Sequence, residues 1–304
     1  MNQKIKVLLD VMTIPIIFWI LAIVLWQTPD HVFYLFDFGY LGTAIGIGGG
    51  LYEFFPKKKK HLGRKAAQLL IGMYMVAFLG LLNAENMQLE GFFFYLLMGV
   101  FAPAAMHYAI AKIVGPLVFN RGWCGWACWT AMVLDFRPYP KSPGRMPRRW
   151  EWGRSAHFAV SLALVLGLWF GCDYRLERGA TELFWLVLGN LVYFSSGIAL
   201  AYALRDNRAF CKYLCPIAVL LKIGARFAML KITGDAAKCN ECGVCTRSCP
   251  MDIEIPQYVK NGQRVLSTEC IFCLTCTNAC PKQALTYSFK FDVGGKECLR
   301  RRPD

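Results

Sequence analysis

The first two thirds of the chain consist of long apolar runs separated by short polar segments. An α-helix needs roughly 20 apolar residues to cross a bilayer. Six runs come close to this length or exceed it: residues 7–26, 33–55, 67–84, 91–118, 155–171 and 183–204. The pattern predicts a membrane all-α bundle of about six transmembrane helices in residues 1–204. A connecting segment (205–230) and a small C-terminal domain (231–304) follow.

The Lys and Arg residues predict the orientation of these helices, because such residues concentrate in cytoplasmic loops. Segments 57–65 and 137–154, which follow the second and fourth spans, are rich in both. Loops 27–32, 85–90 and 172–182 carry no excess of positive charge, so we expect them on the outer side. An even number of spans then places both termini in the cytoplasm.

Composition supports a membrane protein that binds metal. Of the 304 residues, 56% are hydrophobic and only 18% are charged, which is unusual for a water-soluble domain. The net charge of +14 could suggest nucleic acid, but most basic residues stand between apolar runs, so we expect membrane lipid and no nucleic acid. The 14 cysteines fall mainly in regular motifs, which favours metal over disulfides. Cys172 and Cys298 stand alone, and we expect neither to be a ligand.

Two cysteine runs near the C-terminus, Cys239–Pro250 and Cys270–Pro281, each read C-x2-C-x2-C-x3-C-P. In two-cluster ferredoxins the fourth cysteine of each run binds the other [4Fe–4S] cluster. The predicted ligands of cluster I are Cys239, Cys242, Cys245 and Cys280. The predicted ligands of cluster II are Cys249, Cys270, Cys273 and Cys276. Zinc also uses C-x2-C pairs, but two complete runs with a closing proline favour an α+β ferredoxin domain. Between them, Val259–Val265 contains Asn-Gly, which suggests a β-hairpin.

Two further segments, 120–128 and 207–215, share the pattern N-R-x-aromatic-C-x-aromatic-x-C at the predicted cytoplasmic ends of membrane helices. On a helix, C-x3-C places both sulfurs on one face, one turn apart. Four thiolates could then converge: Cys124, Cys128, Cys211 and Cys215. They would suit a third iron–sulfur cluster or a single iron, with Arg121 and Arg208 offsetting its negative charge. The alternative is four small buried residues in close-packed helices.

Other polar residues in or near the predicted spans have simpler interpretations. His107 could contact a quinone, although a hydrogen-bonded interhelical histidine is the more common situation. His107 and His157 lie at different predicted depths, so we expect no haem between them. Lys112 is expected to extend toward the cytoplasmic interface. The tail Arg300–Arg302 reads as a solvated or lipid-facing end, and no residue stands out as catalytic.

The order of these features resembles the family of NapH-, NosR- and CcoG-type membrane ferredoxins. The resemblance covers about residues 90–285 and rests on the paired C-x3-C motifs followed by two ferredoxin runs. The chain departs from the family pattern at Trp129, because Pro216 follows the second pair but no proline follows the first. For the NapH and NosR types the resemblance implies quinol oxidation or electron delivery. For the CcoG type it implies reduction of a metal ion during assembly of an oxidase.

The leading hypothesis is a membrane-bound electron-transfer subunit in the inner (cytoplasmic) membrane of a bacterium or archaeon. It would pass electrons between the quinone pool, or another membrane redox partner, and a cytoplasmic redox partner within a larger respiratory or oxidoreductase complex. One alternative is an assembly factor that reduces a metal ion for a redox enzyme. Another is a membrane anchor for a larger oxidoreductase.

Overall fold

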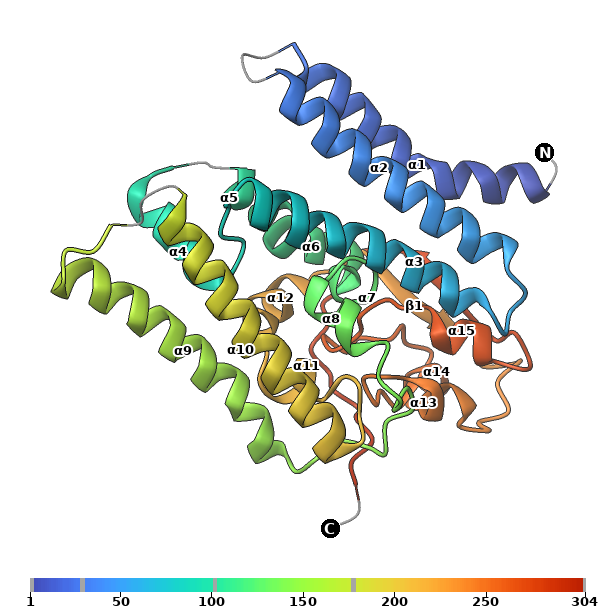
Figure 1. Cartoon of the computed structure of the whole chain (residues 1–304). Helices are drawn as coiled ribbons and strands as arrows, with labels where there is room; N and C mark the ends of the chain where they lie inside the picture. Colours follow the sequence, from blue (N-terminus) through green and yellow to red (C-terminus); the bar gives the residue numbers. More distant parts are fainter. Residues whose placement is uncertain (1–2, 28–30, 101–102, 176–178, 303–304) are drawn as a thin grey trace.

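A computed structural model describes residues 3–27, 31–100, 103–175 and 179–302. Figure 1 shows a bundle of long helices with a smaller domain, coloured orange to red, packed against one side. Short helices lie between the bundle and this domain. The fold is mostly helical, as predicted.

Among the residues that the structure describes, four helices are long and apolar enough to cross a membrane. They are α2 (His31–Phe54), α3 (Lys60–Met73) continued by η1 (Tyr74–Leu82), η3 (Arg148–Glu151) continued by α9 (Trp152–Leu166) and η4 (Gly167–Gly171), and α10 (Ala180–Leu204). Large apolar side chains such as Phe36, Val160 and Leu191 remain exposed on them, as expected of lipid-facing surfaces. These helices match the second, third, fifth and sixth predicted spans, and they support a membrane protein.

The first predicted span is also helical. Helix α1 (Gln3–Leu25) contains Pro15 and packs against α2. Pro15 cannot donate a helical hydrogen bond. The described apolar part of α1, Met12–Leu25, is shorter than the four long helices. That α1 crosses the membrane therefore stays a prediction.

The fourth predicted span, 91–118, was wrong as a single helix. Helix α4 (Leu89–Met98) ends at Gly99, whose φ is +67°. The main-chain N–H of Gly99 donates to Leu96 O (3.2 Å), which closes the last turn. Glycine adopts this left-handed conformation at little cost, so it ends helices readily. A second set of helices then begins: α5 (Pro103–Tyr108), η2 (Ala109–Val114) and α6 (Gly115–Phe119).

The segment before α4 was predicted to be a loop on the outer side; it is buried among the helices, and the side on which it lies stays a prediction. Asn86, Met87 and Gln88 are each at least 96% buried. The main-chain N–H of Asn86 donates to the hydroxyl of Tyr95 in α4 (3.3 Å), so this segment runs back alongside α4. Segment 83–88 therefore re-enters the bundle, and α4 begins inside it.

Short helices surround the four membrane cysteines. They are α7 (Gly122–Trp126), α8 (Trp129–Leu134), α11 (Ala209–Tyr213) and α12 (Ile217–Ala225). In each C-x3-C motif the first cysteine is helical and the second lies beyond the helix end: Cys128 is extended (ψ 123°), and Cys215 follows α11. The prediction that each pair shares one helical face was therefore wrong.

The C-terminal domain is α+β. Strand β1 (Leu230–Gly234) pairs antiparallel with β2 (Leu285–Phe289), with Leu230 opposite Phe289 and Gly234 opposite Leu285. The helices between the strands are α13 (Val244–Ser248), α14 (Ile255–Lys260) and α15 (Thr275–Ala279). Because the first and last strands pair, they enclose both cysteine runs within one compact unit.

The hairpin predicted over Val259–Val265 does not form. Val259 and Lys260 belong to α14, and Gly262 has φ +62° just after the helix ends. The Asn-Gly pair therefore ends a helix, where a left-handed glycine is equally favourable. Val265 then donates its N–H to Ile232 O in β1 (2.7 Å).

The basic tail was expected to be solvated or lipid-facing; Arg301 is exposed, but the tail is also bonded to the rest of the chain. The Arg145 N–H donates to Arg300 O (3.0 Å), and the Arg302 N–H donates to Arg145 O (2.8 Å). The Arg302 guanidinium also donates to Leu204 O at the end of α10 (2.7 Å). The tail thus joins the loop before α9 to the end of α10.

Both Lys- and Arg-rich segments lie at the end of the bundle that faces the C-terminal domain. Near the first segment, Asn278 of α15 donates to the Tyr52 hydroxyl of α2 (2.6 Å). In the second, Arg145 pairs with the tail. This grouping agrees with the charge pattern, while the placement of that end in the cytoplasm stays a prediction.

Candidate iron–sulfur centres

Two cavities in the C-terminal domain each gather four cysteines. The first is lined by Cys239, Cys242, Cys245 and Cys280, together with apolar residues such as Val259 and Leu285. The second is lined by Cys249, Cys270, Cys273 and Cys276, with Ile232, Met251 and several other apolar residues. In both, the fourth cysteine of one run joins three cysteines of the other. These are the two groups of four that the sequence predicts.

The two cysteine loops share an unusual backbone. Glu241 and Gly243 flank Cys242 with φ values of +52° and +71°, and Phe272 and Leu274 flank Cys273 with +48° and +57°. Positive φ in residues other than glycine is uncommon and concentrates at functional sites. Backbone turns of this type direct N–H groups into concavities that bind anions, including iron–sulfur clusters. Each loop therefore offers thiols and N–H donors to one cavity, which suits an anionic cluster.

The membrane cysteine site, defined as Cys124, Cys128, Cys211 and Cys215, brings both motif copies together. Each thiol lies close enough to the other three to influence its charge. The two copies also share a local fold, because Cys128 donates its N–H to Trp123 O (3.0 Å) and Cys215 to Phe210 O (2.8 Å). The repeated sequence pattern thus produces a repeated structure around four converging thiols.

The spacing of these thiols bears on what they can bind. Among the described residues, no three His, Cys, Asp or Glu side chains stand close enough to hold a single metal ion. Ligands of a multi-iron cluster stand farther apart, because each one binds a different iron. Which of the two predicted groups, a third cluster or a single iron, binds at these thiols stays a prediction.

Arg208 lies directly beside the membrane cysteine site. Its guanidinium donates to Cys124 O (2.9 Å) and lies 4.0 Å from Cys211 Sγ. It also forms an ion pair with Asp135 (2.6 Å), which Arg64 approaches from α3 (2.8 Å). Arg208 therefore holds the two cysteine segments together as well as placing positive charge near them.

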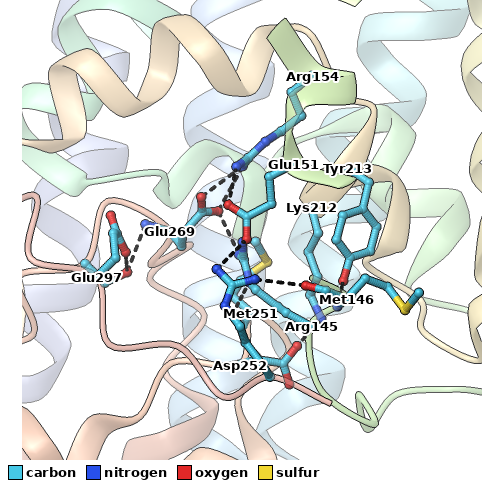
Figure 2. A network of polar contacts seen from close by, with 12 residues as sticks. Arg145, Met146, Glu151, Arg154, Lys212, Tyr213, Met251, Asp252, Glu269 and Glu297 are labelled. Atoms are coloured by element: carbon cyan, nitrogen blue, oxygen red, sulfur yellow. Dashed lines mark hydrogen bonds and ion pairs between the residues drawn. The ribbon is translucent and has the colours of Figure 1, made fainter. Parts of the chain in front are cut away.

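Arg121, the equivalent residue in the first segment, pairs with Glu269, the residue before Cys270. Glu269 is fully buried and forms four ion pairs, with Arg121 (2.8 Å), Arg145 (2.9 Å), Arg154 (2.9 Å) and Lys222 (2.8 Å). Figure 2 shows Arg145 and Arg154 converging on Glu269 and Glu151. Burial alone would raise the pKa of Glu269, but these four cations hold it well below its usual range. Glu269 is therefore an anion at the junction of the two domains.

A second buried network lies nearby. Lys212, between Cys211 and Cys215, pairs with Asp206 (2.6 Å) and with Asp252 of the C-terminal domain (2.5 Å). Arg300 in the tail also pairs with Asp252 (2.8 Å).

Sequence reasoning missed Glu269, Asp135 and Asp252. All three pair with residues far away in the chain, so no local pattern marks them. The one available signal is the position of Glu269 directly before a cysteine run.

The membrane cysteine segment also touches the second ferredoxin loop directly. Arg121 donates its N–H to Cys270 O (3.2 Å), and the Trp126 indole donates to Phe272 O (2.9 Å). Between them, a Cβ on Gly125 would lie 2.2 Å from Ile271 O. Glycine is therefore required there, and the membrane cysteines adjoin the second cavity rather than the first.

The remaining candidate residues have other surroundings. His107 lies 3.3 Å from the Asp37 carboxylate of α2, so a contact between helices accounts for it, and the quinone contact stays a prediction. Lys112 is only 3% exposed and lies over the rings of Trp123 and Trp129, so its predicted extension to the interface was wrong. Neither Cys172 nor Cys298 lines either cavity.

Comparison with known proteins agrees with this arrangement. The description "4Fe-4S dicluster domain" matches residues 231–281, and "4Fe-4S binding domain" matches residues 101–139 and 188–232. The second description thus covers both membrane cysteine segments. Fold and site together define a membrane protein with iron–sulfur-binding domains of the ferredoxin type.

Three relatives narrow the class. An uncharacterized protein of Methanocaldococcus jannaschii is 38% identical over 116 residues, covering 34% of this chain and 45% of that protein. YccM of Escherichia coli, named for electron transport, is 30% identical over 64% of this chain and 59% of its own length. The ferredoxin-type protein NapH of Haemophilus influenzae is 27% identical over 64% of this chain and 69% of that protein. The chain is thus similar to the NapH-type membrane ferredoxins.

The matched region spans about half of the first relative and three fifths of the second. No solved structure matches the chain.

Proposed function

We propose that this protein is a membrane-bound electron-transfer subunit. It passes electrons between the quinone pool, or another membrane redox partner, and a cytoplasmic redox partner. The observation that carries the proposal is the main-chain contact between the membrane cysteine segment and the second ferredoxin loop, from Arg121 to Cys270. This contact supports a continuous path from the membrane cysteine site to the second cavity and then to the first.

Three sites would hold the redox groups. Cys239, Cys242, Cys245 and Cys280 hold cluster I, and Cys249, Cys270, Cys273 and Cys276 hold cluster II. The membrane cysteine site holds a third iron–sulfur cluster, supported by the convergence of its thiols and by the 4Fe-4S domain match to both segments. A bound cluster supplies one-electron oxidation and reduction.

The protein residues prepare these sites for anionic clusters. Burial raises the pKa of the Cys249 and Cys270 thiols to about 12, so binding iron must release their protons. The apolar walls of the second cavity, including Ile232 and Met251, exclude water. At the membrane cysteine site, buried Arg121, Arg208 and Lys112 offset negative charge.

We also propose that the chain lies in the cytoplasmic membrane of a bacterium or archaeon, with both termini in the cytoplasm. The grouping of the Lys- and Arg-rich segments beside the ferredoxin domain supports this placement. A larger respiratory or oxidoreductase complex would then supply the cytoplasmic partner.

Metal analysis tests the proposal. Anaerobically purified protein should contain about 12 iron atoms per chain, because three cubanes hold four each, whereas two cubanes would give about 8. EPR spectra should show reduction of a cluster when a quinol is added. Replacing both Cys124 and Cys211 with Ala should lower the iron content and block that reduction. Unchanged iron and electron flow would instead favour an anchor, and reduction of a free metal ion in place of a protein partner would favour an assembly factor.

A further inference from the structure

A group of polar side chains lies inside the bundle beside the membrane cysteine site. We call Gln88, Glu90, Tyr108 and Tyr193 the α4 polar site. Gln88, Tyr108 and Tyr193 are 1%, 3% and 2% exposed, and Glu90 is half-buried. Tyr193 lies close enough to Glu90 and Tyr108 to interact with them electrostatically. Gln88 packs against Gly189, one turn before Tyr193 on α10.

Most of these groups have no hydrogen-bond partner. Within residues that the structure describes, neither hydroxyl of Tyr108 and Tyr193 is paired, nor is either polar atom of the Gln88 amide. Buried polar groups are nearly always hydrogen-bonded, because an unpaired one loses its interactions with water. Three unpaired side chains in one place indicate that a molecule outside the chain completes the site.

The site lies near the middle of the membrane. Tyr193 is close to the centre of the 25-residue helix α10, about 16–20 Å from either end at 1.5 Å per residue. Glu90 accepts a hydrogen bond from Ser161 (2.5 Å), near the middle of the span formed by α9 and its flanking turns. Because segment 83–88 re-enters the bundle, α4 starts at this depth and directs the positive end of its dipole inward. Interrupted helices of this kind form ligand sites in membrane proteins.

The walls around these groups are aromatic. The Phe92 ring stacks on Tyr108 at 4.2 Å between centroids, and Phe93 meets Phe158 edge-on at 5.9 Å. An apolar site with a few polar groups is typical of small-molecule binding. The head group of a quinone is a flat ring with oxygens at opposite ends, so it can stack on aromatic rings and bond to polar groups on both sides.

The site adjoins the membrane cysteines. Tyr108 and Tyr193 both lie close enough to Cys215 to interact electrostatically. The Tyr193 ring contacts Phe210, the residue before Cys211, at 5.4 Å between centroids. A molecule bound there would therefore stand beside the start of the proposed electron path.

We propose that the α4 polar site binds the head group of a membrane quinone. The Tyr108 and Tyr193 hydroxyls and the Gln88 amide donate to its oxygens, and the Glu90 carboxylate accepts from a hydroxyl of the quinol form. The choice of a quinone over another flat lipophilic ligand rests on the proposed function.

Binding of decylubiquinone and of a short-chain menaquinone analogue to the full chain in detergent, measured by calorimetry, tests this site. The double variant Tyr108→Phe/Tyr193→Phe should bind the oxidised form at least tenfold more weakly. Glu90→Gln should weaken binding of the reduced form more than that of the oxidised form, because only the quinol has hydroxyls to donate. Tyr202→Phe is the matched control, since Tyr202 lies on the same helix near its end and is half exposed; its affinity should not change.

Iron content equal to that of the wild type, together with full reduction by dithionite, shows that each variant is folded. The proposal is overturned if the double variant binds both compounds as the wild type does, or if the wild type binds neither and water alone fills the site. The proposed function fails separately if the wild type binds quinol but no cluster is reduced by it. If quinol reduces the clusters equally well in the double variant, the function stands and this site is wrong.

Discussion

The ferredoxin domain and the membrane cysteine site hold cysteines in opposite ways. In the ferredoxin domain, three cysteines of each cavity come from one short loop, whose backbone conformation directs them inward. At the membrane site, two segments meet through contacts such as Arg208 to Cys124, which joins residues 84 positions apart. Buried ions at Asp135 and Glu269 hold these segments in place. The first arrangement is local and the second depends on the whole fold, so the two should fail differently when perturbed.

The largest effect should come from removing a cysteine from either part. The variant Cys273→Ala should lose about four iron atoms per chain. The membrane cysteine site should keep its iron, because the loop around Cys273 is formed by residues close together in the sequence. Cys211→Ala should lose a similar number and leave both ferredoxin cavities loaded. Iron analysis with EPR distinguishes these results. Loss of all iron in either variant would show that the two parts do not assemble independently.

The next effect should follow from Glu269→Gln, which leaves four buried cations without their common anion. Removing one partner of a buried ion pair costs about 3–5 kcal/mol, and unfolding in mixed micelles should show a loss of that order. Asp173→Asn is the control, because Asp173 is largely exposed and its ion-pair partner Arg175 is exposed too. It should change the free energy of unfolding by about 0.5 kcal/mol or less. Equal effects would mean that the Glu269 network does not hold the domains together.

A smaller effect is expected at the contact between the two parts. Gly125→Ala places a Cβ against Ile271 O, a backbone atom that cannot easily move. Overpacking of this kind costs about 1–3 kcal/mol, and electron transfer from the membrane site to the ferredoxin domain should slow in rapid-mixing measurements. Gly50→Ala is the matched control, since nothing lies within 4 Å of its added Cβ. Slowing in both variants would remove Gly125 as the point of contact.

The smallest effect concerns pH and the sheet that closes the ferredoxin domain. Burial tends to raise the pKa of Asp292, but hydrogen bonds from Arg264 and Lys231 lower it overall. A carboxyl with a lowered pKa stabilises the fold above its unfolded pKa of about 4, and this contribution is lost as pH falls through the folded value. Asp292→Asn should therefore destabilise the protein at pH 7, and its difference from the wild type should shrink as the pH falls below about 4. A constant difference across this range, in thermal unfolding followed by circular dichroism, would contradict the assignment.

Sequence reasoning succeeded where the information is local. Apolar runs of sufficient length predicted four helices that the structure contains, because a spanning helix satisfies its own backbone hydrogen bonds. The spacing of the two cysteine runs also predicted which four cysteines line each cavity. Reading the Asn-Gly pair as a hairpin failed, because Gly262 can equally well end a helix and only the packing of α14 decides between these roles.

The sequence by itself determined the membrane character of the chain, its iron–sulfur chemistry and the repeated cysteine motif, since each depends on composition or short spacing. Only the tertiary structure decided that residues 83–88 re-enter the bundle, that the basic tail pairs with the loop before α9, and that Glu269 gathers four cations. These features arise from contacts between residues far apart in the chain, and no local pattern records which distant partner a buried charge will find. The four membrane cysteines stand between the two cases: their repeat can be read in the sequence, but their convergence depends on how the helices pack.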